Sequence, residues 1–193
     1  MRTYLDCLPC FVRQALEASR MATQDERVQR KVLDSVMVRL SHLSLDATPP
    51  EIAQVVHSLV KYVTGNPDPY REVKKEHNRI VLDLYPRIRE IVSESDDRLR
   101  SGIKMAIAGN LIDLGVQTDL GDLEGSIYNA FSSNLTINNY DEFRATLMHS
   151  DLLLYLGDNA GEIVFDKVLI EEIKMLSDME IVFIVREKPI IND

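Results

Sequence analysis

The sequence predicts an α + α/β protein, in which a helical N-terminal part is followed by the start of an α/β domain. Two observations support this fold class. Apolar residues recur every three or four positions through most of residues 8–114, a spacing that is typical of amphipathic helices. Towards the C-terminus, a helical pattern lies between two short apolar segments, residues 152–156 and 181–185, and this order predicts a parallel βαβ unit.

The helices of the N-terminal part are separated by recognisable start and stop signals. Asp25 is suited to cap the second helix, and the sequence TPPE at 48–51 places proline in the first turn of the third. The sequence GNPDPY at 65–70 is the strongest turn signal in this half of the chain and ends the third helix. The apolar periodicity predicts helices over residues 8–21, 28–40, 52–63, 70–94 and 98–114.

Gly109 and Asn110 are unusual residues for the interior of a predicted apolar helix. A glycine there costs about 1 kcal/mol of stability relative to alanine, which indicates either close packing or a functional turn. Because asparagine follows the glycine directly, we interpret the pair as functional.

Residues 116–150 are polar and irregular, and they are predicted to contain one or two helices, over 121–131 and 140–149. The two apolar segments that follow have the composition of strands buried on both faces, and a helix over 163–176 connects them. This arrangement predicts that the two strands are parallel.

The change of pattern divides the chain into two predicted domains. We place a helical N-terminal domain at residues 1–95, and a helical connector with an incomplete α/β domain at residues 96–193. The chain stops directly after the second strand, and two parallel strands do not make a stable, doubly covered sheet. We therefore expect a fragment of a longer protein, or a subunit that a partner chain completes.

Composition excludes several classes of partner. The 193 residues carry a formal net charge of −9, whereas contacts to nucleic acid or to an anionic membrane need clustered Lys and Arg. No segment is apolar for long enough to span a bilayer, and the N-terminus lacks the apolar segment of a signal peptide. The only cysteines, Cys7 and Cys10, are too few and too close to form the disulfide framework of a secreted protein, so we expect a cytoplasmic protein.

Acidic and amide side chains follow both predicted strands. Asp158 and Asn159 leave the first strand, and Asn192 and Asp193 follow the second. Ligands of open α/β sheets bind outside this carboxyl edge, and carboxylate and amide oxygens suit Mg²⁺ or Mn²⁺. Gly161 allows the backbone to approach a ligand closely. The next helix begins there, and the N-terminus of a helix favours an anion such as a phosphate ester. The alternative is that Asp158 or Asn159 simply caps that helix.

Five motifs of the chain, taken in order, resemble one known family. They are DCLPC at 6–10, GNPDPY at 65–70 followed by Lys74, AGNLID at 108–113, GDNAGE at 157–162 and ND at 192–193. Each motif is weak alone, but five in this order are specific. On these residues the chain resembles the metal-dependent damage-control phosphatases, also called domain of unknown function 89, and in particular their prokaryotic branch with an N-terminal CxxC motif.

The resemblance implies a fold, an activity and a set of metal ligands. The family's fold joins a helical part to a three-layer, Rossmann-like α/β domain, and its members continue well past residue 193. The implied activity is hydrolysis of small phosphorylated metabolites, such as sugar phosphates or damaged metabolites, by water activated on a divalent ion (Mn²⁺, Co²⁺, Ni²⁺ or Mg²⁺). Asp158, Asn159 and Asp193 match the metal ligands, and Asn110 and Asp113 would line the same pocket.

Further residues have a functional and a structural interpretation. Asp158 is also the candidate to orient or deprotonate the attacking water. Glu162 could support the site or be a solvated charge at a helix start, and Arg186 and Lys188 could contact substrate phosphate or be exposed loop cations. Cys7 and Cys10 could hold zinc or another soft metal, form a redox pair, or be two half-buried residues that open a helix.

The sequence leaves other functions open. A non-catalytic, metal-dependent ligand-binding module is the main alternative, and a subunit completed by a partner chain is its variant. Methyl transfer to carboxylates is disfavoured, because no glycine-rich nucleotide loop follows a strand. The substrate, the physiological metal and whether the protein forms a homo-oligomer are also left open.

Overall fold

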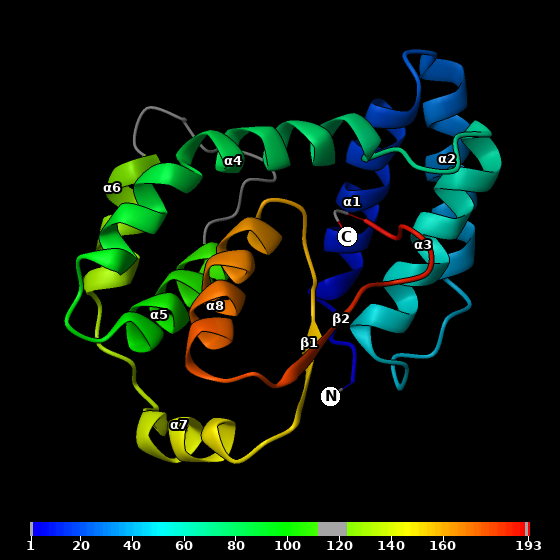
Figure 1. The fold of residues 1–193 in the computed structure, drawn as a ribbon. Helices are drawn as coiled ribbons and strands as arrows, with labels where there is room; N and C mark the ends of the chain where they lie inside the picture. The colour runs from blue at the N-terminus through cyan, green and yellow to red at the C-terminus, as the bar shows by residue number, and fades with distance from the viewer. Residues whose placement is uncertain (1, 112–122, 192) are drawn as a thin grey trace. The chain divides into compact units, whose positions relative to one another are not determined.

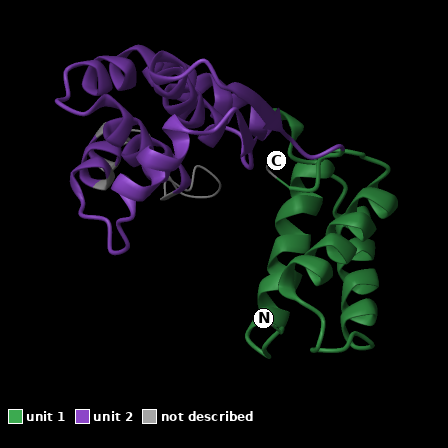
Figure 2. Ribbon diagram, turned by 60° about the horizontal axis from the view of Figure 1, so that its bottom comes forward, with its two compact units in different colours: residues 1–72, 188–192 green, residues 73–187, 193 purple. Residues whose placement is uncertain are grey.

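The computed structural model describes residues 2–111, 123–191 and 193 (Figure 1). The chain forms two compact units, which Figure 2 shows in different colours. Unit 1 is the chain up to Glu72 together with the segment from Lys188 to Ile191, and unit 2 is the chain from Val73 to Glu187 together with Asp193. The domain boundary that we predict near residue 95 is not tested by this division and stays a prediction.

Most of the described chain is helical, and two short strands lie near its C-terminal end. The elements are α1 (Cys7–Ala22), α2 (Glu26–Leu40), α3 (Pro49–Thr64), α4 (Arg71–Ser93), α5 (Arg98–Leu111), α6 (Leu123–Ser132), α7 (Tyr140–Met148), β1 (Leu152–Leu156), α8 (Glu162–Leu176) and β2 (Glu180–Ile184). The order of helices, strand, helix and strand agrees with the order predicted from the sequence. The predicted end of the fifth helix, at residue 114, lies outside the described residues.

In unit 1, α1, α2 and α3 pack around a shared apolar core that includes Phe11, Val36 and Val56. Their start and stop signals work as predicted. The Asp25 side chain accepts a hydrogen bond from the main-chain N–H of Arg27 at 2.8 Å, which caps α2. A capping box starts α3, and Gly65 ends it in the left-handed region with φ of 70°.

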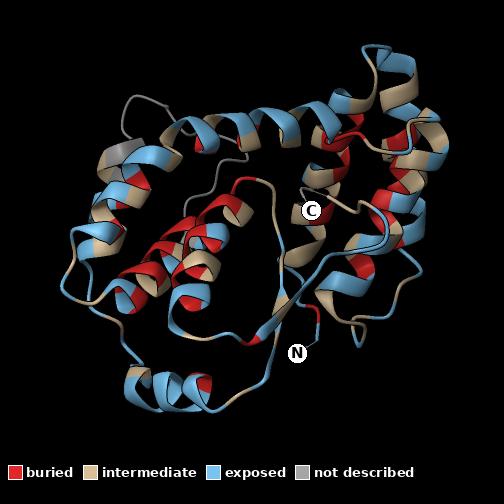
Figure 3. Ribbon diagram, viewed as in Figure 1, coloured by how far each residue is buried: buried red, intermediate tan, exposed pale blue. Residues whose placement is uncertain are grey.

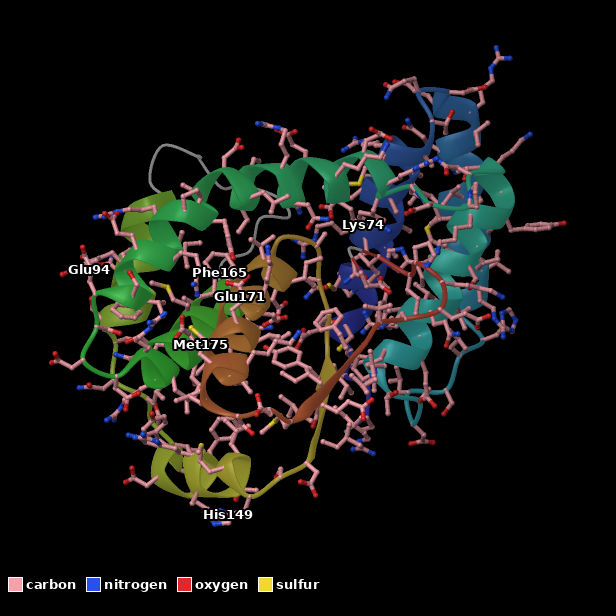
Figure 4. The ribbon with its side chains drawn as sticks, in the orientation of Figure 1. Lys74, Glu94, His149, Phe165, Glu171 and Met175 are labelled. Carbon is pink, nitrogen blue, oxygen red and sulfur yellow. The ribbon has the colours of Figure 1, made fainter. Side chains whose placement is uncertain are left out.

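In unit 2, α5 and α8 lie against each other, and Gly109 is the reason that they can approach closely. A Cβ atom added to Gly109 would lie only 2.7 Å from the Cγ and Cδ2 atoms of Phe165, whose side chain is 1 % exposed. Figure 4 labels Phe165 on α8. The interpretation of Gly109 as a functional residue is therefore wrong, since its role in this fold is packing.

The two strands pair in parallel, with Leu152 opposite Glu180 and Leu156 opposite Ile184. Within the described residues, one face of this pair is covered, by a core to which α8 contributes Leu169 and Ile173. Along β1 the exposed and half-buried residues alternate, and α8, which Figure 3 shows with several buried residues, packs on the covered face. The prediction of strands buried on both faces is wrong for these residues, because no described element covers the second face.

Candidate functional site

Two main-chain N–H groups hold the turn between β1 and α8 in place. The main-chain N–H of Gly157 donates to the carbonyl oxygen of Ile184 at 2.9 Å, which continues the pairing of the strands. Gly161 has a φ of 85°, a conformation that favours glycine, and α8 begins directly after it. Its N–H donates to the Oδ1 atom of Asn78 on α4 at 2.7 Å. Because of these contacts, the side chains of the turn emerge from a fixed backbone.

The two aspartates that follow the strands meet the same cation. The Nη1 atom of Arg186 lies 2.8 Å from Oδ1 of Asp158 and 3.3 Å from Oδ2 of Asp193. The Asp158 side chain is 45 % exposed and that of Asp193 only 4 %. The carboxyl ends of both strands therefore deliver an acidic oxygen to one point, as expected for an open parallel sheet.

Amide side chains connect this point to α5. The Nδ2 atom of Asn159 donates to Oδ2 of Asp158 at 3.2 Å and to Oε2 of Glu162 at 3.1 Å. The other oxygen of Glu162 accepts from Nδ2 of Asn110 at 2.9 Å. We call the connected set Asn110, Asp158, Asn159, Glu162, Arg186 and Asp193 the strand-end network.

The charges of the strand-end network are balanced around Arg186. Burial disfavours the charged guanidinium and by itself would lower the pKa of Arg186. The carboxylates of Asp193 and Asp158 have the larger combined effect, so the pKa of Arg186 is raised. A second cation approaches Asp193, because Nζ of Lys74 donates to the main-chain oxygen of that residue at 3.0 Å. Lys74 lies near the start of α4 and is labelled in Figure 4. The point where the strands end is therefore a place where positive charge is stabilised.

A buried acid lies behind the network on α8. Asp166 is 4 % exposed and accepts a hydrogen bond from the hydroxyl group of Tyr155 at 2.6 Å, which ties β1 to α8. Burial raises the pKa of Asp166 to about 6, although the hydrogen bond from Tyr155 lowers it, and the carboxylates of Glu162 and Asp158 add to the increase. Burial and the bond to Asp166 also raise the pKa of Tyr155.

This shift makes the stability of the fold depend on pH in a defined direction. The folded protein holds the Asp166 proton more tightly than the unfolded chain, so this residue stabilises the fold at low pH and the effect is lost as pH rises through about 6. In Asp166→Asn, which cannot titrate, the free energy of unfolding relative to wild type should rise by roughly 1–3 kcal/mol from about pH 4 to pH 7. Urea denaturation at a series of pH values measures this difference, and a constant difference would contradict the raised pKa.

The remaining predicted site residues fall into three groups. Asp113 and Asn192 lie outside the described residues. Lys188 is exposed and belongs to unit 1, where it lines a cavity beside α3. Cys7 and Cys10 are free thiols, both half-buried, and Nε2 of Gln14 donates to Sγ of Cys10 at 3.3 Å.

No group of three or more His, Cys, Asp or Glu side chains with metal-binding geometry is found within the described parts of the chain. The predicted ligand set of Asp158, Asn159 and Asp193 contains two such side chains and one amide, and its role as a metal site stays a prediction. For Cys7 and Cys10, the metal, redox and structural interpretations all stay predictions.

Sequence reasoning missed Asn78 and the pair of Tyr155 and Asp166. Asn78 lies in the middle of the long helix α4, where one polar residue among many carries no visible signal. Asp166 could have been found, because three of its four neighbours at a distance of three or four residues along α8 are apolar: Ile163, Leu169 and Ile170. A polar residue on the buried side of a helix needs a partner, and Tyr155 supplies it.

The fold and the strand-end network define a mostly helical protein with a polar, acidic site at the carboxyl edge of two parallel strands. Within the described residues, no helix has both the length and the apolar character that crossing a membrane requires. A family model described as the damage-control phosphatase ARMT1-like domain matches residues 3–193. The chain belongs to this family, and the resemblance seen in its motifs is confirmed.

Relatives of this chain include archaeal proteins of the same family. An uncharacterized protein of Methanocaldococcus jannaschii is 36 % identical over 97 % of this chain and 63 % of its own length. Damage-control phosphatases of Pyrococcus horikoshii and Archaeoglobus fulgidus are 32 % and 31 % identical, over 100 % and 97 % of this chain and 67 % and 65 % of their own lengths. This chain thus spans about two thirds of the length of these relatives.

A solved structure supports the fold. The crystal structure of a DUF89 family protein from Pyrococcus horikoshii superimposes with a TM-score of 0.85 at 28 % sequence identity. The match covers 100 % of this chain and 67 % of that chain. The helical part and the parallel strand pair are therefore features that this chain shares with a protein of known structure.

Proposed function

We propose that the protein is a divalent-metal-dependent phosphatase that hydrolyses phosphomonoesters of small metabolites. The observation that carries the proposal is the convergence of Asp158 and Asp193 on one cation, Arg186, at the carboxyl ends of two parallel strands. Two relatives of similar sequence have the name damage-control phosphatase, which supports the reaction class.

The donors of the strand-end network fit a hard divalent ion such as Mg²⁺, Mn²⁺, Co²⁺ or Ni²⁺. Asp158 and Asp193 supply carboxylate oxygens, and Asn159 supplies an amide group next to Asp158. A set of two carboxylates and one amide leaves coordination positions for water, as is common for Mg²⁺. When bound, such an ion would polarise a phosphoryl oxygen and lower the pKa of a bound water.

The side chains of the network have distinct roles in this proposal. Asp158 is the more exposed of the two carboxylates, and in this proposal it would orient the attacking water and accept its proton. Asn159 and Glu162 hydrogen-bond each other, and through Asn110 they fix the carboxylates to α5. Asp158 and Asp193 would hold the ion through oxygens that now contact Arg186, and the Arg186 guanidinium would then be available to pair with the substrate phosphate.

We propose that the complete protein contains a three-layer α/β domain. Leu152, Leu154 and Leu156 on β1 are exposed by 50 %, 53 % and 72 %, whereas parallel sheets are normally covered on both faces. The solved relative is longer than this chain, which is consistent with further strands and helices. The activity and substrates of the whole protein therefore rest on more residues than these.

The proposal predicts that activity depends on a removable metal. The complete gene product should hydrolyse phosphomonoesters such as sugar phosphates, lose this activity after treatment with EDTA and regain it with Mn²⁺, Co²⁺, Ni²⁺ or Mg²⁺. A panel of phosphorylated metabolites, assayed by phosphate release with each ion in turn, measures this. Metal binding without phosphate release from any member of the panel would favour a non-catalytic, metal-dependent binding module instead.

A further inference from the structure

Unit 1 contains a cavity of about 770 Å³ that shares no residue with the strand-end network. Its walls come from α3, from the turn at 65–70 with the start of α4, and from the segment 188–190, all of which belong to unit 1. We call it the α3 cavity. Its volume falls within the range of about 300–1,000 Å³ that is typical of small-molecule sites.

The wall of the α3 cavity is positively charged although the chain as a whole is acidic. Lys61, Arg71 and Lys188 line it, and Asp68 is the one acid among its lining residues. The chain as a whole carries a formal net charge of −9, so the excess of cations at this cavity is local. A cavity lined in this way concentrates anions by focusing the positive potential.

Hydrogen bonds connect the segments that form the cavity wall. The Lys61 ammonium group donates to the carbonyl oxygen of Pro189, which fastens the C-terminal segment to α3. Gly65 turns the chain at the end of α3, and the side chain of Asn66 accepts from the N–H of Asp68 at 3.0 Å. The N–H of Arg71 donates to the carbonyl oxygen of Asp68 at 3.3 Å, and α4 begins there.

Two of the three cations are not neutralised by the described part of the protein. Among the described residues, the side chains of Arg71 and Lys188 form no ion pair or hydrogen bond. The remaining wall includes the buried ring of His57 and the ring of Tyr62, which is 86 % exposed. The cavity thus combines uncompensated positive charge with aromatic surface against which an organic group can pack.

We propose that the α3 cavity binds a small molecule that bears a phosphate group. Arg71 and Lys188 contact the phosphate, and the exposed ring of Tyr62 faces the organic part. The turn at 65–70 thereby has a role of its own as one wall of a binding site. This site is additional to the phosphatase site and does not depend on the metal.

The test is a titration of inorganic phosphate into the complete protein with EDTA present, followed by the NMR shifts of the backbone amides. Saturable shifts are expected in the non-proline residues of 54–71 and in Lys188 and Ile190. The double variant Arg71→Gln/Lys188→Gln should weaken binding at least about tenfold, because it removes two charge-assisted contacts. The matched control is Arg27→Gln/Lys31→Gln, which removes the same charge from exposed positions of α2 in the same unit and should change affinity by less than about twofold.

A further variant separates this site from the proposed phosphatase site. Asp158→Asn alters the strand-end network but should leave the phosphate-induced shifts of residues 54–71 unchanged. The inference is overturned if phosphate produces no saturable shift in these residues, if the shifts centre on residues 157–162, or if the Arg71/Lys188 double variant binds as wild type does. Failure of the phosphatase assay alone would leave binding at the α3 cavity intact.

Discussion

Replacing Asp158 with asparagine should lower the metal-dependent phosphatase activity of the complete protein at least about 100-fold. The substitution keeps the shape of the side chain but removes the negative charge that Asp158 directs towards the shared cation position. Loss of mere outer-shell partners of metal ligands costs about 10–100-fold in affinity or activity, so loss of a ligand should cost more. Steady-state phosphate release, together with the increase in melting temperature that Mn²⁺ produces, measures the effect.

Asp151 provides a matched control for this substitution. It precedes β1 and therefore lies at the opposite end of the strand pair, where its main-chain oxygen accepts from the N–H of Glu180 at 2.9 Å. Asp151→Asn makes the same chemical change on an exposed side chain and should leave both activity and the response to metal unchanged. If Asp158→Asn retained wild-type activity and metal response, Asp158 would not be part of the site.

That Asp158 and Asp193 lie near the same edge could be predicted from the topology of parallel strands. Two parallel neighbouring strands end at the same edge, so side chains of the segments that follow them can meet there, although Asp193 lies nine residues beyond the end of β2. That Arg186 joins the two carboxylates could not be predicted, since its position depends on how the chain continues after β2. Asn110 was predicted from the resemblance, and the partner through which it reaches the network, Glu162, became visible only in the structure.

Burial was harder to predict from the sequence than the elements themselves. The apolar residues of β1 are typical of a doubly covered strand, but whether a second layer covers them depends on residues elsewhere in a domain. For Gly109, the sequence showed that the residue was unusual but not why. Its presence in a helix signalled something unusual, but only the position of Phe165 on another helix distinguishes packing from function.

Replacing Phe165 with alanine should be among the most destabilising single substitutions in unit 2. The side chain is 1 % exposed and lies in a core with Met105, Val164 and Val168, so its removal leaves a cavity between tightly packed helices. Such substitutions cost about 3–5 kcal/mol. The free energy of unfolding from urea denaturation measures this, and Phe143→Ala, at a position that is 39 % exposed, is the control with the smaller expected loss.

Because Gly109 and Phe165 are in contact, the stability cost of a substitution at one position should depend on the residue at the other. Gly109→Ala should cost about 1–3 kcal/mol, since the clash with Phe165 exceeds the gain in helix propensity. In the Phe165→Ala background the cost should fall without vanishing, because alanine retains the Cβ atom, which lies 2.8 Å from the added methyl group. Gly102→Ala, on the same helix, would meet the Cα atom of Leu169 at 3.3 Å and should not couple to Phe165. Equal costs of Gly109→Ala in both backgrounds would show that the close approach of α5 and α8 does not depend on this pair.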